Sequence, residues 1–439
     1  MNIPTKGFPL KLLCLASLPL ILIGCGGSSG GPVPPDTVKS ESLEVIDARQ
    51  VTLNHVSAGG STYTVLDWGD GTTEEIHDSG QHSHTYEGEY TGEISLESHC
   101  YAPCKTTVDI SGNVTLDTSG LANISPTTLS VDGVTAFTGS LSSLPKSITK
   151  LAITAESLEG DLADLPPNLK SLILRNDGNE KILGSIASLP KSIEFLNLYS
   201  TEQFTGDFAD LPSSIKSVHL SRNTLGGKLS ELNRSLESVY IYNVYPGDQG
   251  DNLNDLPPNL TSLGLSNLTV GGSLSDLPRT LTYLSIREGN AVYGTISELP
   301  ASLTTLTLGN GFNLTGMYSE LPGKLTSLSF GQDVRISGSM GDLPSTLTSF
   351  SWDDATQPDQ LVTKLPNGLG QILLDSKTET FASDYVDSIL SVLDANGLSS
   401  SNSQSSLNVR LMGDTMEAAT NTGAIDSLTS KGWTVNVKS

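Results

Sequence analysis

Leucine recurs through the middle of the chain in a pattern that repeats about every 22 residues. One unit reads L-P-x-x-L-x-x-L-x-L, as from Leu165 to Leu174, and it closes on a glycine such as Gly184. The alternation in L-x-L has the period of a β-strand, and so short a unit leaves little room for a long helix. We therefore expect one short strand per unit with its leucines pointing inward. The first leucine falls at Leu144, Leu165, Leu189, Leu211, Leu232, Leu256, Leu277, Leu299, Leu321, Leu343 and Leu365, and Leu232 is followed by Asn in place of Pro.

Eleven units at near-constant spacing indicate a solenoid, because one unit cannot bury its leucines until neighbouring units stack on it. The pattern resembles the leucine-rich repeat family, and its L-P-x-x-L-x-x-L-x-L motif is most similar to that of the short bacterial type. That resemblance implies a solenoid over residues 118–375 in which each unit adds one parallel strand. A degenerate unit from Ser125 to Val131 is expected to open the stack. The asparagine that usually follows LxxLxL is present at Asn223 but missing from most units, so an asparagine ladder is not assumed.

Residues 40–117 alternate in the manner of strands, at 63–66, 90–96 and 106–110. Between the first two runs lies the turn 67–72 (DWGDGT), whose Asp-Gly pairs supply positions with positive φ. The turn and the later segment 84–90 (HTYEGEY) together resemble the PKD-like domain pattern. The resemblance implies an immunoglobulin-like β-sandwich used as a spacer or adhesion module.

Residues 376–439 switch to helical spacing. Phe381, Tyr385, Ile389 and Leu393 recur at i+4, a second helical run spans 417–429, and 434–437 reads as a strand. This end resembles the C-terminal caps of bacterial surface repeat proteins. The predicted fold is thus mainly β: a leucine-rich-repeat solenoid of about eleven 22-residue units, preceded by an immunoglobulin-like (PKD-like) β-sandwich and closed by a small α/β cap.

The first 24 residues have the pattern of a secretory signal. Lys6 and Lys11 precede an apolar run from Leu12 to Gly24, and that run is shorter than the roughly 20 residues a membrane-spanning helix needs. Residues 22–25 (LIGC) resemble the bacterial lipobox, which implies acylation at Cys25, palmitate included, and an anchor in the membrane. Residues 25–39 form a Gly/Ser/Pro tether. A plain signal peptide with an incidental cysteine is the alternative.

Composition and motifs argue against several classes of function. With 48 acidic and 24 basic residues the formal charge is −24, which argues against nucleic acid as a partner. No GxSxG, HExxH or P-loop motif is present, so we expect no enzyme activity and no cofactor. Secreted effector ubiquitin ligases share the LPxxLxxLxL repeat, but the lipobox and the lack of a large catalytic domain with a nucleophilic cysteine argue against that class.

Two small groups of residues, a cysteine pair and a set of histidines and carboxylates, each allow more than one interpretation. Cys100 and Cys104 are predicted to form a disulfide, since exported proteins meet an oxidising compartment; a redox or zinc pair is the alternative, without a second cysteine pair to complete it. His82 and His84 lie at i and i+2, as metal ligands on a strand would, and Asp67, Asp70 and Glu74 could hold calcium weakly. Hydrogen-bonded histidines and a hydrogen-bonded turn account for the same residues, so no metal site is assigned.

The positions between the repeat leucines face the exposed side of the sheet and form the candidate ligand-binding surface. Most of them are Ser, Thr or Gly. Tyrosines that expose both ring and hydroxyl suit sugars or protein hot spots, although tyrosine also favours exposed strands in general. The candidate ligand-binding residues are Phe195, Asn197, Tyr199, His219, Tyr240, Tyr242 and Tyr283.

The sequence predicts a lipid-anchored, monomeric binding protein of the bacterial cell envelope, an adhesin or recognition module for a protein or glycan outside the cell. Gly26, in place of an aspartate after Cys25, favours the outer membrane if the source is Gram-negative, with the repeats at the cell surface. Two alternatives stay open: a periplasmic scaffold, and an accessory protein in polysaccharide use.

Overall fold

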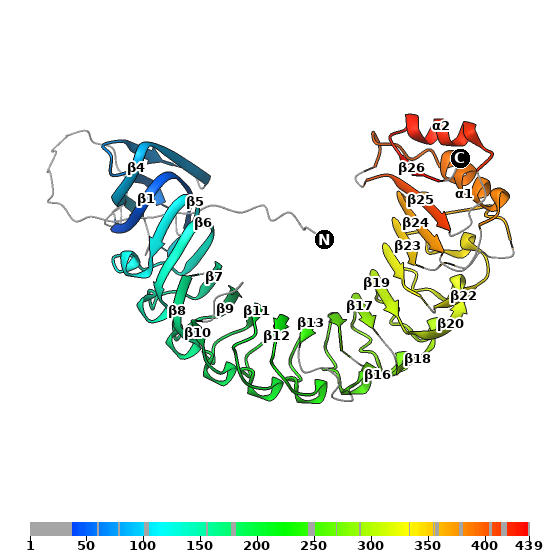
Figure 1. The fold of residues 1–439 in the computed structure, drawn as a ribbon, viewed down its shortest axis with the longest axis horizontal. Helices are drawn as coiled ribbons and strands as arrows, with labels where there is room; N and C mark the ends of the chain where they lie inside the picture. The colour runs from blue at the N-terminus through cyan, green and yellow to red at the C-terminus, as the bar shows by residue number, and fades with distance from the viewer. Residues whose placement is uncertain are drawn as a thin grey trace, which may run out of the picture. The chain divides into compact units, whose positions relative to one another are not determined.

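A computed structural model of the chain describes residues 37–58, 61–77, 80–100, 105–154, 157–176, 181–244, 251–268, 270–288, 291–332, 334–353, 355, 360–376, 381–403, 406–413 and 419–437. The chain divides into two compact units. The first takes in the chain up to Ile215 together with Ser221–Leu225, and the second takes in Lys216–Leu220 and Gly226–Ser439. Figure 1 follows the chain from blue to red through both units.

The first unit begins with antiparallel strands. The strands are β1 (Thr37–Ala58), β2 (Ser61–Asp67), β3 (Thr73–Ile76), β4 (Gly80–Cys100) and β5 (Lys105–Asp117). β1 pairs with β4 and β5, and β2 pairs with β3 and β4. All three strands predicted in this region are therefore confirmed. The immunoglobulin-like arrangement implied for residues 40–117 stays a prediction.

β5 joins the antiparallel region directly to the repeats. One of its edges is antiparallel to β1, and the other is parallel to β6 (Thr128–Ser140). Val108 and Ile110 of β5 lie opposite Leu129 and Val131 of β6, and all four side chains are at most 1% exposed. The predicted opening unit thus supplies the start of β6, and β5 adds a strand in register before it.

The repeats in the first unit stack their strands in parallel. β6 pairs with β7 (Lys150–Thr154), β7 with β9 (Ser171–Arg175), and β9 with β11 (Phe195–Thr201). Leu151, Leu172 and Leu196 share one register level and are at most 1% exposed. A second line of pairing joins the end of β6 to β8 (Ser157–Asp161) and β10 (Ile182–Leu183). The division between the two units passes through β12 (Ser217–Asn223).

The second unit continues the pattern with two parallel sheets. The longer one contains β13 (Ser238–Val244), β15 (Ser262–Ser266), β17 (Tyr283–Glu288), β19 (Thr305–Asn310), β21 (Ser327–Phe330), β23 (Ser349–Asp353) and β24 (Gln371–Ser376). The shorter one contains β14 (Asp251–Asn252), β16 (Val270–Ser273), β18 (Ala291–Thr295), β20 (Asn313–Met317) and β22 (Arg335–Ser337), and it lies on the other side of the coils (Figure 1). Inward leucines of both sheets form the core, as Leu284, Leu306 and Leu314 at 0% exposed show. This architecture is consistent with the predicted leucine-rich-repeat solenoid.

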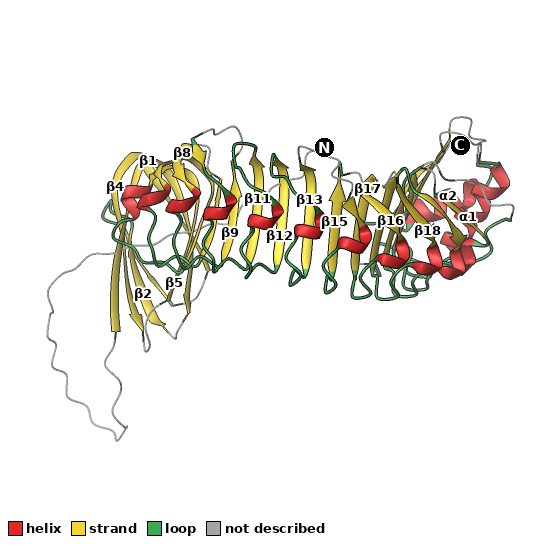
Figure 2. Ribbon diagram, turned by 90° about the horizontal axis from the view of Figure 1, so that it is seen from below, coloured by secondary structure: helices red, strands yellow, loops and turns green. Residues whose placement is uncertain are grey.

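A short 3-10 helix precedes every Leu-Pro or Leu-Asn step except the one at Leu365, and one more lies before β6 (Figure 2). In the unit that starts at Leu165, Asp161 caps the helix by accepting a hydrogen bond from the Ala163 amide at 2.8 Å. A three-residue helix fits where a long one would not, as the unit length predicts. The helices are 118–121, 141–143, 162–164, 186–188, 208–210, 229–231, 253–255, 274–276, 296–298, 318–320 and 340–342.

A ladder of threonine hydroxyls joins successive coils of the second unit. The Thr304 hydroxyl donates to the backbone carbonyl of Thr282 at 3.0 Å, and the Thr326 hydroxyl donates to the carbonyl of Thr304 at 3.1 Å. Thr261, Thr282 and Thr348 make the equivalent bond to the coil before them. The hydroxyls supply side-chain bonds between coils whose sequences mostly lack the asparagine discussed above.

The C-terminal segment contains the elements predicted for it. Helix α1 (Ser383–Ala395) and helix α2 (Thr422–Ser430) are present, and β25 (Asn408–Gly413) and β26 (Thr434–Asn436) extend the longer sheet in parallel. Phe381, Tyr385, Ile389 and Leu393 are all at most 2% exposed. Whether the segment acts as an end cap stays a prediction. Among the described residues, no helix has the length and apolar character needed to cross a membrane.

Candidate functional site

Four of the candidate residues gather on the longer sheet of the second unit. His219 comes from β12, Tyr240 and Tyr242 from β13, and Tyr283 from β17. β15 pairs with both β13 and β17, so it separates the two tyrosine-bearing strands. Its residue in register with Tyr240 is Gly264. The rings therefore meet over a position that has no side chain of its own.

We call these four residues the aromatic cluster. The Tyr240 ring lies at the centre, with its centroid 4.3 Å from the His219 ring and 5.6 Å from the Tyr283 ring. The Tyr240 and Tyr242 centroids are 6.3 Å apart. All four side chains are partly buried, which leaves part of each ring accessible and fixes the rest by packing.

Glycine at position 264 allows this packing. A Cβ placed there would lie 2.2 Å from the Tyr242 hydroxyl oxygen and 2.6 Å from Cδ1 of Tyr240. Gly264 and the neighbouring Ser285 are both buried beneath the exposed face. Small residues on β15 and β17 thus create the space that the rings of β13 fill.

Burial dominates the electrostatics of the cluster. It raises the pKa of the Tyr242 hydroxyl, and the nearby tyrosines and a hydrogen bond with Tyr283 act in the same direction. The Arg287 guanidinium opposes that rise, which places a cation within electrostatic range of the hydroxyl. Burial also lowers the pKa of the His219 imidazole. These shifts favour the neutral forms of the Tyr242 hydroxyl and the His219 imidazole near neutral pH.

The face around the aromatic cluster is poor in charge. Among the outward positions on β13, β15, β17, β19 and β21 whose side chains are described, none is acidic and Arg287 alone is charged. The remainder present rings, hydroxyls or glycine. The positions are Ser238, Tyr240, Tyr242, Ser262, Gly264, Ser266, Tyr283, Ser285, Arg287, Thr305, Thr307, Gly309, Ser327 and Ser329.

The other three candidates lie on β11 of the first unit. Phe195, Asn197 and Tyr199 are partly buried and alternate with the fully buried Leu196 and Leu198, as the strand pattern predicts. The Arg222 guanidinium lies 5.5 Å from the centroid of the Tyr199 ring.

Gly264 and Arg287 are functional candidates that the sequence analysis did not single out. Outward positions can be recognised from the L-x-L pattern, but which of them meet across strands depends on register. A glycine facing two tyrosines of the preceding unit was the available signal.

The turn 67–72 packs against segment 84–90 through a stack of rings. The Trp68 and His84 rings stack with centroids 5.0 Å apart, His84 meets Tyr86 edge-on at 4.6 Å, and Tyr86 stacks on Tyr90 at 4.6 Å. The Tyr86 hydroxyl donates to the Trp68 carbonyl at 3.0 Å. Gly69 and Gly71 take φ values of 83° and 94°, which confirms the predicted turn geometry. Each motif residue named here therefore has a structural role.

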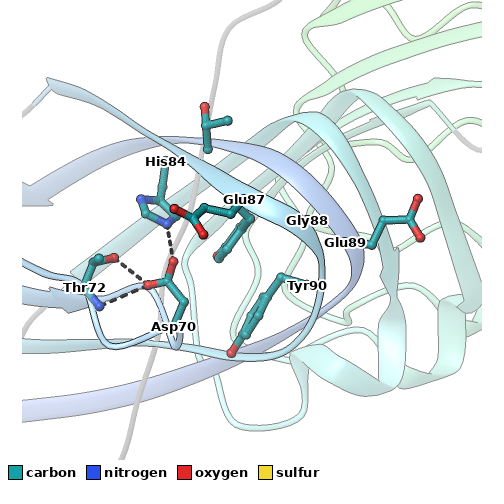
Figure 3. Close-up of a pocket in the computed structure, with 9 residues that line it drawn as sticks. Asp70, Thr72, His84, Glu87, Gly88, Glu89 and Tyr90 are labelled. Atoms are coloured by element: carbon teal, nitrogen blue, oxygen red, sulfur yellow. Dashed lines mark hydrogen bonds and ion pairs between the residues drawn. The ribbon is translucent and has the colours of Figure 1, made fainter.

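Asp70 ties the two segments together. One of its carboxylate oxygens accepts the Thr72 hydroxyl and amide at 2.6 and 3.0 Å, and the other lies 2.7 Å from Nε2 of His84 (Figure 3). The Thr72 hydroxyl contributes most to lowering the pKa of Asp70 to about 2. A surface hollow of about 560 Å³ adjoins this pair, and Glu87, Gly88 and Glu89 also line it (Figure 3).

The metal alternatives gain no support from the described part of the chain. His82 directs Nδ1 to a Glu74 carboxylate oxygen at 2.8 Å, and His84 pairs with Asp70. No group of three potential metal-ligating residues occurs among the described residues. Each histidine thus has one ring nitrogen bonded to a carboxylate, whereas Nε2 of His82 is buried without a hydrogen-bond partner from the described residues.

Two predicted modifications lie outside the described residues. Cys25 and Cys104 both fall in parts of the chain that are not described, and Cys100 is described only as the end of β4. Lipidation at Cys25 and the Cys100–Cys104 disulfide stay predictions.

Comparisons with known proteins do not assign a family. No family model matches the sequence, and no curated protein matches it. One similar solved structure, a "plant peptide hormone receptor RGFR1 in complex with RGF2", is 15% identical, covers 76% of this chain and 66% of its own, and has a TM-score of 0.39. Another, "CroV588 a novel circular LRR protein structure", is 20% identical, covers 60% of this chain and 50% of its own, and has a TM-score of 0.28. With TM-scores below 0.5, neither carries an argument about this chain.

Proposed function

We propose that the chain is a lipid-anchored cell-envelope binding protein, an adhesin or recognition module that presents its repeat strands to a protein or glycan outside the cell. The aromatic cluster is the observation that carries the proposal. Its rings are held by mutual packing and by Gly264 before any ligand arrives. Prepositioned side chains lose less conformational entropy on binding, and tyrosine is among the residues that dominate binding energies.

The proposed location rests on the N-terminal sequence. Acyl chains on Cys25 would anchor the protein, since each buried methylene contributes about 0.8 kcal/mol, and the tether 25–39 would separate the domains from the membrane. The ring stack of Trp68, His84, Tyr86 and Tyr90 suits a rigid spacer between that tether and the repeats. The outer membrane, with the repeats outside, is the location we propose.

Protease treatment of intact cells, with lysed cells as control, tests this orientation. The proposal expects the repeat region to be lost from intact cells, and survival until lysis would favour the periplasmic scaffold instead. A Cys25→Ser variant supplies the matched test of the anchor: cells grown with labelled palmitate should label the wild-type chain but not the variant. Equal labelling of the two chains, or no labelling of the wild type, would contradict the lipid anchor.

Accessory action in polysaccharide use is the second candidate. Tyrosine rings bordered by serine hydroxyls favour it, because this chemistry also suits a sugar chain. Loss of growth on one polysaccharide, with adhesion unchanged, in a deletion strain would favour this role over adhesion.

A further inference from the structure

The outward face of β13 to β21 differs in charge from the rest of the chain. Charged residues make up 16% of the sequence, with 48 acids among them. Among the described side chains at the outward positions of this face, Arg287 is the one that is charged. Glu237 lies just before β13, but its carboxylate is paired with the Lys216 ammonium at 3.7 Å. Apart from Arg287, the described side chains around the aromatic cluster on this face are neutral, in a protein that is otherwise strongly acidic.

The neutral groups are of two kinds, rings and hydroxyls. Tyr240, Tyr242 and Tyr283 supply rings whose faces are apolar and whose edges carry hydroxyls. Ser262 and Ser266 flank Gly264 on the strand between them, and Thr305 and Thr307 continue the same register levels on β19. A sugar ring has the complementary composition, with apolar C–H faces and hydroxyls around its edge.

The spacing of the rings suits more than one sugar residue. Tyr283 lies at the register level of Ser238, two residues below that of Tyr240, and Tyr242 lies two residues above it. The backbones of the three tyrosines thus occupy three successive outward levels, and their rings converge, with the Tyr240 centroid 5.6 Å from that of Tyr283 and 6.3 Å from that of Tyr242. A chain of linked sugars could contact them in turn.

We infer that the aromatic cluster binds an uncharged polysaccharide whose sugar rings lie against Tyr240, Tyr242 and Tyr283. This inference rests on the proposed binding function. The Arg287 guanidinium and the neighbouring serines donate hydrogen bonds to sugar hydroxyls. A polyanion is disfavoured by the −24 charge of the chain. A protein partner would place apolar side chains on the serines and threonines and leave their hydroxyls unpaired, which costs free energy.

Affinity electrophoresis of the purified full chain tests the inference. The gels contain dextran, yeast mannan, laminarin or xylan as neutral probes and alginate or polygalacturonate as acidic probes. We expect at least one neutral polysaccharide to retard the chain, with retardation that changes less than twofold between about 50 and 500 mM salt, because uncharged contacts are not screened. Tyr240→Ala and Tyr242→Ala should each weaken binding by about tenfold or more.

Matched variants separate binding from folding. Tyr293 lies on β18 in the shorter sheet and is 59% exposed, so Tyr293→Ala should leave binding unchanged. Tyr242→Phe keeps the ring and should retain most of the affinity, even if Tyr242→Ala perturbs the fold. An equal loss in Tyr293→Ala would overturn the assignment to the aromatic cluster.

Two further outcomes would overturn the inference. Retardation by alginate or polygalacturonate alone, abolished by high salt or by Arg287→Gln, would show an acidic ligand instead. Retardation by no polysaccharide would also refute it. In that case immobilised fibronectin, collagen and laminin are tested with the same variants. Capture that is lost in Tyr240→Ala would support the proposed binding function with a protein as the ligand. No capture would refute both the polysaccharide inference and the proposed function.

Discussion

Gly264 lies beneath the hydroxyl of Tyr242, so close that a Cβ at position 264 would lie 2.2 Å from the hydroxyl oxygen. The two residues sit on neighbouring strands, where Gly264 is in register with Tyr240 and Tyr242 is in register with Ser266. The absence of a side chain on β15 is therefore a condition for the arrangement of rings on β13.

Gly264→Ala tests that dependence. The added methyl must displace Tyr240 and Tyr242, and overpacking of this kind costs about 1–3 kcal/mol. We expect a lower urea midpoint together with a changed near-ultraviolet circular dichroism spectrum, since the tyrosines lose their fixed environment. Gly323→Ala is the control, because no atom lies within 4 Å of a Cβ at that position. Equal effects of the two substitutions would contradict the packing described here.

His219 predicts a pH dependence of stability. Burial lowers the pKa of its imidazole, so the unfolded chain, with a histidine pKa near 6.5, takes up the proton first as the pH falls. The contribution of His219 is therefore fully present above about pH 6.5 and is lost as the pH falls toward the lower pKa of the folded state. Urea midpoints at pH 8.0 and 5.5 measure this change.

The variant His219→Gln should show a smaller loss between those two pH values than the wild-type chain. His77→Gln serves as control, because His77 is exposed and paired with Glu75 at 2.8 Å. If His219→Gln keeps the whole pH dependence of the wild type, burial of this imidazole is not its source.

Removing one hydroxyl from the threonine ladder should lower the stability of the fold. Thr304→Val keeps the shape of the side chain but removes the hydroxyl that donates to the Thr282 carbonyl at 3.0 Å. One such bond contributes about 0.5–1.5 kcal/mol, so the urea midpoint should fall. Thr307→Val, on the outward face of the same coil, should cost less. If Thr304→Val and Thr307→Val are equally stable, the hydroxyl bonds between coils contribute nothing to stability.

Gly69 tests the ring stack of the first unit. A Cβ there would lie 2.1 Å from the Glu93 carbonyl oxygen and from the Tyr90 hydroxyl, and its φ of 83° is one that side chains rarely adopt. We expect Gly69→Ala to lower the melting temperature and to weaken the near-ultraviolet signal of Trp68. At Gly88 no atom lies within 4 Å of an added Cβ, so Gly88→Ala should behave as wild type. A stable Gly69→Ala chain with an unchanged spectrum would rule out the packing described for Tyr90.

The repeat architecture was predictable because its information is local. Leucines at LxxLxL spacing can be buried in one way only, and the strands at 171–175 and 305–310 lie where that spacing puts them. The helix containing Tyr385 and Ile389 was likewise readable from i+4 spacing.

Features that depend on pairing between distant residues were not predictable. Thr282 and Thr304 read as ordinary polar positions, and their ladder appears only when the coils stack. The antiparallel and parallel edges of β5 depend on partners about 50 residues before it and 20 after it. The aromatic cluster falls between these cases: the outward direction of Tyr240 follows from alternation, but its contact with Tyr283 requires the register through β15.

The central claim is that the outward face of β13 to β21 is the binding surface. Capture of the full chain on immobilised extracellular proteins and polysaccharides tests it, using a double variant with Thr307→Arg and Ser329→Arg, which are partners in register. The matched control is Tyr293→Arg on the shorter sheet. We expect a captured ligand that the double variant loses and the control keeps. Capture that survives the double variant would place the binding surface elsewhere.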